Sequence, residues 1–201
     1  GSSPGGYSTT FDLTENPISE SQHWSRASNA FTSVVTENGV AHGTNGPANA
    51  YDDSYALLSG FGPNQEAEAV IERSSMLATG TTHEVELLLR FSDDSGNARG
   101  YECLFAYFGG VQSMRWNGPM GSFTELPTSV SNSLGRELVT GDVIKANIIG
   151  TIISLYINGA LMARATDTMF TTGQPGIGFF TRPGGNSLHL AITSYGARTL
   201  P

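Results

Sequence analysis

The sequence predicts an all-β protein in which two antiparallel sheets pack face to face as a jelly-roll sandwich. Three observations lead to this fold class. Strand-length segments alternate apolar with polar side chains, turns rich in Gly and Asn separate them, and no segment has the composition of a helix. The clearest segment is 141–166, where Gly150-Thr151 and Asn158-Gly159 are two-residue turns that connect three antiparallel strands. About a dozen such strands suit two packed sheets.

The expected strands follow one another along most of the chain. Segment 66–73 illustrates the pattern, because Ala67 and Ala69 share one face while Glu66 and Glu68 share the other. The expected strands are 11–16, 32–36, 39–42, 51–58, 66–73, 82–91, 100–108, 111–116, 143–148, 152–157, a third meander strand that ends at 166, 175–181 and 187–195, with 19–30 as a loop or outer strand and 117–136 as a loop at the rim of the sheets.

Length and composition indicate one domain. A chain of 201 residues with 38% hydrophobic content can bury one substantial core. The 25 Gly and 9 Pro residues fit many short strands joined by tight turns. We therefore expect a linker or flexible N-terminus over 1–10 and a single β-sandwich domain over 11–201.

Charge and sequence pattern exclude several classes of partner. The net charge is −8 and Lys145 is the only lysine, so a nucleic-acid or membrane-surface partner is not expected. No apolar run reaches the length of a membrane span, and residues 1–10 lack the features of a signal peptide. The single cysteine, Cys103, excludes a disulfide framework. The sequence leaves the oligomeric state open.

Several segments resemble a known group of domains. The run GDVIKANIIGTIISLYINGALMARATDTMF, followed by TGQPGIGFF, is similar to the C-terminal half of concanavalin A-like, laminin G-like jelly-roll domains of secreted bacterial proteins. The segments HEVELLLRF, ARGYE and VQSMRWNGPMGSFTEL extend the resemblance over roughly 50–195. The resemblance implies a two-sheet jelly roll and an extracellular or secreted location. This superfamily contains lectins, binding modules, glycanases, lyases and virion components, so the fold alone does not select a function.

The candidate catalytic residues are Glu84, Glu86 and Glu102. Glu84 and Glu86 share a strand face with α-carbons roughly 6.6 Å apart, a spacing compatible with either class of glycosidase carboxyl pair. Glu102 lies on the next strand, near this face. Laminarinase-type and lichenase-type glycanases resemble this fold and carry an E-x-D-x-x-E strand motif. Here Leu88 and Leu89 stand where its last acid should be, so that catalytic set is incomplete.

Arginine and aromatic side chains are the candidate sugar-binding residues. Arg90 and Arg115 could cluster with the glutamates and orient sugar hydroxyls, or form a purely structural ion network with them. Aromatic faces cover the C–H face of a pyranose, and Trp116 stands at a strand end that opens into the 117–136 loop. The full set of expected substrate-binding residues is Arg90, Tyr107, Arg115, Trp116 and Asn117, with Trp24 and Tyr51 as further aromatic candidates.

No metal-ligand motif is present. His23, His42, His83 and His189 are dispersed, and His83 shares its strand face with apolar residues, which predicts an interior position. We therefore expect no cofactor and no metal-ligating residues, although a structural calcium ion is compatible with the resemblance.

Three functions remain open from the sequence. The first is a lectin-like domain that binds a polysaccharide or oligosaccharide in a groove on one sheet. The second is a polysaccharide-cleaving enzyme, either a hydrolase or a lyase, that uses Glu84 or Glu86 with Glu102. The third is a structural surface or virion assembly protein that uses the sandwich as a rigid block.

Overall fold

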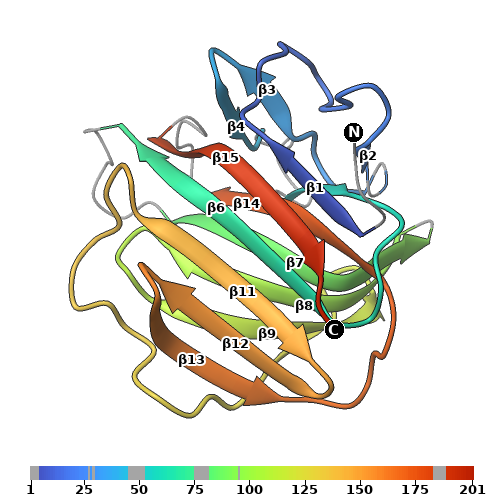
Figure 1. Ribbon diagram of the computed structural model, residues 1–201, viewed down its shortest axis with the longest axis vertical. Coiled ribbons are helices and arrows are strands. Elements are labelled where there is room, and N and C mark those ends of the chain that lie inside the picture. The colour runs from blue at the N-terminus through green and yellow to red at the C-terminus, as the bar shows by residue number, and fades with distance from the viewer. Residues whose placement is uncertain are drawn as a thin grey trace.

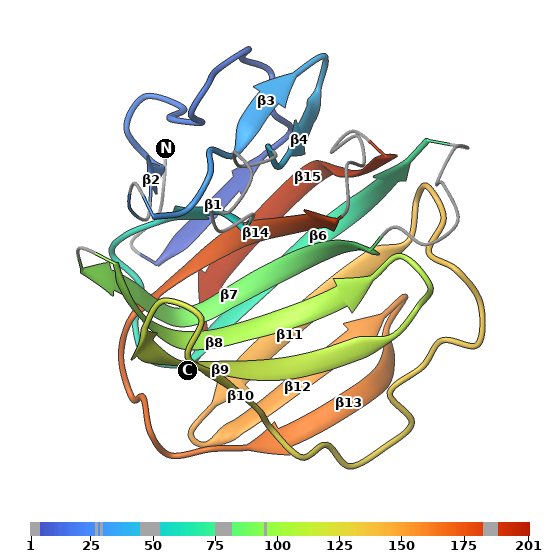
Figure 2. The same ribbon diagram turned by 180° about the vertical axis from the view of Figure 1, so that it is seen from behind.

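The structure, a computed structural model, describes residues 5–26, 28, 30–44, 53–74, 82–94, 96–182 and 189–201. Two antiparallel sheets of eight and seven strands pack face to face, and the described residues contain no α-helix (Figures 1 and 2). The predicted fold class is confirmed.

The first sheet, sheet A, faces the viewer in Figure 1. Its strand order along the hydrogen-bonded path is β13-β12-β11-β6-β15-β4-β3, and β1 also pairs with β15. The strands are β1 (Gly6–Thr9), β3 (Val35–Glu37), β4 (Val40–His42), β6 (Gln65–Arg73), β11 (Val143–Ile149), β12 (Ile152–Ile157), β13 (Ala160–Thr166) and β15 (Leu190–Thr199).

The second sheet, sheet B, faces the viewer in Figure 2. Its order is β10-β9-β8-β7-β14-β5-β2, so β14 joins the early strand β5 to the β7–β8–β9–β10 meander. The strands are β2 (Ser25–Arg26), β5 (Ser54–Leu57), β7 (Thr82–Asp94), β8 (Asn97–Ala106), β9 (Val111–Pro119), β10 (Phe123–Glu125) and β14 (Gln174–Arg182).

The 141–166 meander forms as predicted. β11 pairs with β12, and β12 with β13, through turns in which Gly150, Asn158 and Gly159 adopt positive φ angles. These are the backbone conformations that twist-matched hairpin turns require, and they explain why the turn residues predicted these strands so clearly.

The main core lies between the sheets. Ala67 and Ile71 of β6 face it from sheet A, and Val85 and Leu87 of β7 face it from sheet B, all fully buried. His83 is also fully buried on the same face of β7, in the interior position that the sequence predicted. The apolar half of each alternating strand therefore points inward, which leaves the other half for the outer faces.

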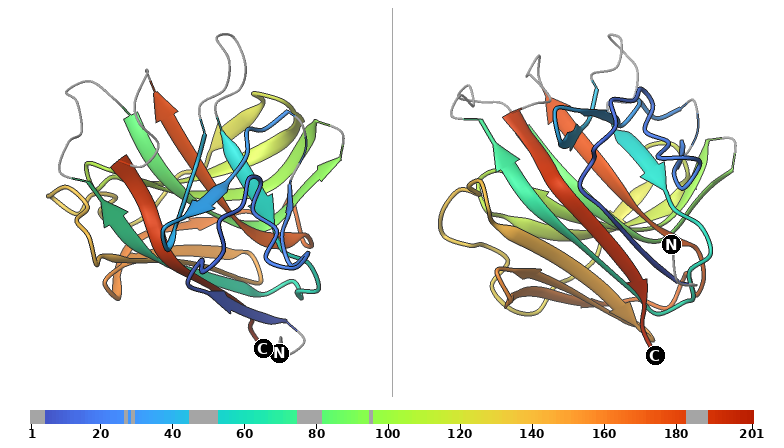
Figure 3. Two further views of the ribbon diagram at one scale, coloured as in Figure 1. Left: turned by 90° about the horizontal axis from the view of Figure 1, so that it is seen from above. Right: turned by 45° about the horizontal axis from the view of Figure 1, so that its top comes forward.

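A second apolar cluster lies on the outer face of sheet B. It is formed by Phe31, Tyr55, Leu57, Leu88, Phe91, Ala98 and Trp116. The chain before β5, which carries Phe31, provides part of this cluster. Phe31 thus covers part of the outer face, while most of the N-terminal segment lies along one edge of the sandwich (Figure 3).

The N-terminus differs from the expectation in two respects. The strand expected at 11–16 does not form, and that segment has only an isolated bridge between Glu15 and Thr36. Residues Gly6–Thr9 form β1, which pairs with Gly196 and its neighbours in β15, rather than a linker. Tyr7 packs edge-on against Trp24 and donates its hydroxyl hydrogen bond to Glu20. The Gly-rich and Ser-rich composition of residues 1–10 is typical of a linker, and for that reason this four-residue strand was not predicted.

Two further differences concern loops. The expected rim loop at 117–136 contains β10, which pairs with β9. The expected strand at 51–58 is observed as β5, Ser54–Leu57, and residues 51–52 lie outside the described part of the chain. Residues 187–188, at the start of the last expected strand, also lie outside it.

A bulge at Arg90 redirects β7 near its end. Arg90 has a φ of 46°, and the pairing with β8 shifts between Leu89 and Ser92. A Cβ atom at Gly100 or at Gly173 would lie 2.5 Å or less from backbone atoms of Arg90, so the bulge fits only between two glycines.

The Arg90 side chain binds backbone carbonyls and no carboxylate that the structure describes. Its guanidinium donates to the oxygens of Pro63, Gly150 and Phe170 at 2.6, 2.8 and 3.0 Å. The side chain therefore ties three loops together at one end of the sandwich, and it is 4% exposed.

We expect Arg90→Met to lower the free energy of unfolding by about 2–4 kcal/mol, because three carbonyls lose a charged donor. Urea denaturation measures this change. The matched control is Arg198→Met, which removes an exposed ion pair with Glu66 and should cost less than about 1 kcal/mol. Equal losses for the two variants would contradict the anchoring role of Arg90.

Candidate functional site

The candidate site lies on the outer face of sheet B, beside the apolar cluster that Phe31 completes. Glu84 and Glu86 point outward here because they alternate with Val85 and Leu87 of the core. Glu84 is half-buried and Glu86 is completely buried. The expectation that these two glutamates share one face is confirmed.

Gly178 makes room for the Glu86 side chain. Gly178 in β14 pairs with Glu86 on one side and with Tyr55 on the other. A Cβ atom at Gly178 would lie 2.5 Å from a Glu86 carboxylate oxygen and 2.5 Å from the Tyr55 ring. The absence of a side chain therefore lets Glu86 and Tyr55 meet above the strand that separates them.

Glu102 is held by two neutral donors. The Tyr55 hydroxyl and the Trp116 indole N–H donate to the same oxygen of Glu102, at 2.6 and 2.5 Å. Both donors are buried, and Glu102 itself is 5% exposed. These bonds fix the Glu102 carboxylate and join β5, β8 and β9 across the sheet.

Asp53 completes a group of three carboxyl groups. One oxygen of each of Asp53, Glu86 and Glu102 lies within 4.8 Å of the others. Sequence reasoning missed Asp53. It precedes β5, which is separated from β7 by β14 and from β8 by both β14 and β7. No local signal in the sequence marked Asp53 as part of a site.

A hollow of about 360 Å³ opens beside these carboxyl groups. Glu84 contributes a carboxyl group to it, and Phe123 from β10 contributes an aromatic ring that is 48% exposed. The complete lining is Asp53, Glu84, Glu102, Leu104, Gln112, Met114, Trp116, Phe123 and Phe180. Aromatic, carboxyl and amide groups thus share one concave surface.

Burial controls the protonation of these acids. It raises the pKa of Glu84 to about 8, with a further contribution from the negative charge of Glu102. Burial also raises the pKa of Glu86, and the charges of Glu102 and Asp53 add to it. The pKa of Glu102 is raised by burial as well, although the hydrogen bonds it accepts oppose this change.

The two arginines do not join the carboxyl groups, and the expected ion cluster is wrong. Arg90 is turned away by its bulge to the loops described above. Arg115 alternates with Met114 and Trp116, so it faces the other side of β9, where it donates to Asp167 at 2.5 Å. Neighbouring residues of a strand point to opposite faces of the sheet, so Arg115 cannot face the hollow when Trp116 does.

Two other expected binding residues also lie away from the hollow. Asn117 accepts a hydrogen bond from Arg115 and donates one to Thr124. Tyr107 packs against the core between the sheets, with its ring edge-on to His83. Of the expected binding residues, the structure brings Trp116 alone to the carboxyl groups. Trp24 is buried in the main core, and Tyr51 lies outside the described residues.

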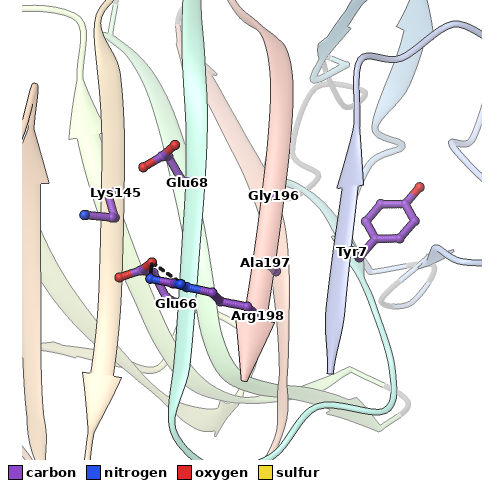
Figure 4. Close-up of a pocket in the computed structure, with 7 residues that line it drawn as sticks. All are labelled: Tyr7, Glu66, Glu68, Lys145, Gly196, Ala197 and Arg198. Atoms are coloured by element: carbon purple, nitrogen blue, oxygen red, sulfur yellow. Dashed lines mark hydrogen bonds and ion pairs between the residues drawn. The ribbon is translucent and has the colours of Figure 1, made fainter. Parts of the chain in front are cut away.

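A second hollow, of about 400 Å³, lies on the outer face of sheet A (Figure 4). Glu66 and Arg198 form an ion pair in it, and Glu68 and Lys145 stand nearby on β6 and β11. Tyr7 on β1 points away from these charged groups. The charges here are exposed and partly paired, as on an ordinary solvated sheet face, so the sheet B hollow is the better candidate site.

Comparison with solved structures identifies the architecture. The chain is similar to the carbohydrate-binding module CBM66 from Bacillus subtilis, with a TM-score of 0.59, 16% identity and coverage of 88% of this chain and 92% of that one. It is also similar to the β-porphyranase BpGH16B from the human gut bacterium Bacteroides plebeius, with a TM-score of 0.55, 10% identity and coverage of 98% of this chain and 93% of that one. The fold is a concanavalin A-like jelly roll.

The carbohydrate recognition domain of Emp46p, in its potassium-bound form, has the same fold, with a TM-score of 0.56, 12% identity and coverage of 96% of this chain and 95% of that one. No protein-family model matches the sequence, and no curated protein does. At these identities the similarity extends to the fold alone. Among the described residues, no helix is long and apolar enough to cross a membrane.

We expect the free energy of unfolding to fall as the pH rises from about 5 to about 8. The folded pKa of Glu84, about 8, exceeds the reference value of 4.5, so the stability contributed by its neutral form is complete below pH 4.5 and lost as the pH rises through about 8. Glu86 and Glu102 act in the same direction.

Glu86→Gln should reduce this pH dependence and stabilise the protein at pH 8, because a neutral amide replaces the buried acid. Urea denaturation at several pH values in buffer with EDTA measures both effects, with a slope of about 1 kcal/mol per pH unit for each titrating group. The control is Glu68→Gln, which removes one exposed carboxylate. A variant curve parallel to that of the unmodified protein would refute the buried acid as its cause.

Proposed function

We propose that this protein binds a polysaccharide or oligosaccharide in the hollow on sheet B. The observation that carries the proposal is the placement of an exposed aromatic ring, Phe123, beside the polar groups of Glu84, Gln112 and Asp53 in one concave surface. In this proposal the carboxyl and amide groups of the hollow make the polar contacts to the sugar, in place of the arginines expected from the sequence.

This combination suits a sugar ring for chemical reasons. The flat face of Phe123 can cover the apolar C–H face of a pyranose, while carboxyl and amide groups accept or donate hydrogen bonds to its hydroxyls. Glu84 has a pKa of about 8, so its neutral carboxyl group can both donate and accept at neutral pH. A neutral or weakly charged sugar fits better than a uronate, because no described arginine or lysine lines the hollow.

Structural similarity supports the proposal without deciding it. The chain shares its fold with a carbohydrate-binding module and a carbohydrate recognition domain. We place the protein outside the cell, where polysaccharides of this kind occur and where the resembling domains act.

Affinity electrophoresis against plant, algal and microbial polysaccharides tests the proposal. We expect retardation by at least one polysaccharide, and Phe123→Ala should weaken that binding about tenfold, because the ring supplies its stacking surface. The control is Phe108→Ala, since Phe108 is similarly exposed but does not line the hollow. No retardation by any polysaccharide would refute the proposal.

A second candidate function is cleavage of the bound glycan. The observation that favours it is Glu84, a carboxyl group that faces the hollow and stays protonated near neutral pH, as a general acid must. Glu102 accepts two hydrogen bonds that favour its charged form, so it is the better candidate for the ionised partner.

Cleavage would be detected as new reducing ends, or as absorbance of unsaturated products in the case of a lyase. We expect Glu84→Gln to reduce any such rate by at least about 100-fold, in line with the contribution of a general acid, while binding persists. Glu68→Gln serves as the control. If the protein binds glycans but produces neither signal, the cleavage function is refuted and the binding function stands.

A further inference from the structure

We propose that Asp53, Glu86 and Glu102 form a binding site for a hard divalent cation such as Ca²⁺ or Mn²⁺. Asp53 directly precedes β5, Glu86 lies in β7 and Glu102 in β8, and their carboxyl groups meet beside the sheet B hollow, which Asp53 and Glu102 line. This proposal is independent of sugar binding, and its test requires no sugar.

The geometry suits one ion shared by three carboxylates. One oxygen of each residue lies within 4.8 Å of the other two, and oxygen–oxygen separations of this size are those found around an ion that has metal–oxygen distances of about 2.0–2.6 Å. Carboxylate oxygens are the ligands that Ca²⁺, Mg²⁺ and Mn²⁺ prefer. Asp53, Glu86 and Glu102 are 6%, 0% and 5% exposed, so the site is built into the sheet and is no surface cluster.

Glu86 provides the second, independent observation. Neither of its oxygens accepts a hydrogen bond from the described part of the chain, although the side chain is completely buried. The one proton of the Tyr55 hydroxyl goes to Glu102 instead. A buried carboxyl group without partners is costly, and a cation among the three acids would satisfy it.

The surrounding residues leave a path and coordination positions for the ion. Asp53 and Glu102 line the hollow, so solvent can reach the site from the outer face. Ca²⁺ takes six to eight oxygens, and waters in the hollow can supply those that the protein does not. Tyr55 and Trp116 donate hydrogen bonds to one oxygen of Glu102, and such bonds hold a metal-binding carboxylate in a fixed orientation.

The alternative occupant of the cluster is a set of shared protons. Protonation also removes the repulsion among three acids, and it predicts no response to cations. Measurements in solution can therefore distinguish the two explanations. A cation that binds near neutral pH must displace those protons, and their release can be measured.

Thermal denaturation and calorimetry test the site. After treatment with EDTA, millimolar Ca²⁺ or Mn²⁺ should raise the Tm by about 3 °C or more, and calorimetry in two buffers of different ionisation enthalpy should show release of about one proton per ion. Glu86→Gln should abolish the Tm shift, whatever its own starting Tm. Glu68→Gln, the same substitution at an exposed position on sheet A, should keep it.

Terbium luminescence locates the ion. The chain has two tryptophans, and Trp116 is hydrogen-bonded to Glu102 whereas Trp24 bonds to Glu20 in the N-terminal segment. Tb³⁺ should give tryptophan-sensitised emission that Ca²⁺ or Mn²⁺ displaces, that persists in Trp24→Phe and that is lost in Trp116→Phe. Circular dichroism confirms that each variant is folded. A cation response that is absent from the unmodified protein, or unchanged in Glu86→Gln, overturns the proposal.

Discussion

The outer face of sheet B depends on one shared hydrogen-bond acceptor. Tyr55 and Trp116 both donate to Glu102, and the three residues belong to β5, β8 and β9, which do not pair directly except for β8 and β9. Both β14 and β7 lie between β5 and β8, and Gly178 of β14 leaves the space through which the Tyr55 ring makes this contact. The buried Glu102 carboxyl group therefore holds the rings of Tyr55 and Trp116 in place. The apolar cluster with Phe31 packs on both rings, and Trp116 also lines the hollow.

The same interaction connects the apolar cluster to the hollow. Phe31 stacks on Tyr55 at a centroid distance of 4.3 Å and meets Trp116 edge-on at 5.8 Å, so the N-terminal segment docks on the aromatic residues that hold Glu102. On the far side, Phe123 approaches Trp116 at 5.5 Å and borders the hollow. Trp116 therefore lies between the Phe31 cluster and the hollow. Because Trp116 is buried, Phe123 is the aromatic ring that a ligand can reach.

The fold could be predicted from the sequence more completely than the site. Period-two patterning and Asn-Gly turns located β6, β7, β11 and β12, because these signals are local. The outward direction of Glu84 and Glu86 followed from the same period. Arg90 was misplaced because its bulge breaks the period, and Arg115 was placed on the wrong face. Asp53 was missed because its proximity to Glu86 depends on strand order, which no local pattern contains.

The strand order also determines when the molecule can be completed during synthesis. β14 lies between β5 and β7, and β15 lies between β6 and the N-terminal strands β1 and β4. Each sheet therefore stays in two pieces until its late central strand leaves the ribosome, with the edges of β5, β6 and β7 unpaired. Such exposed edges favour intermolecular pairing, so a nascent chain of this topology gains from delayed collapse or from a chaperone that shields them.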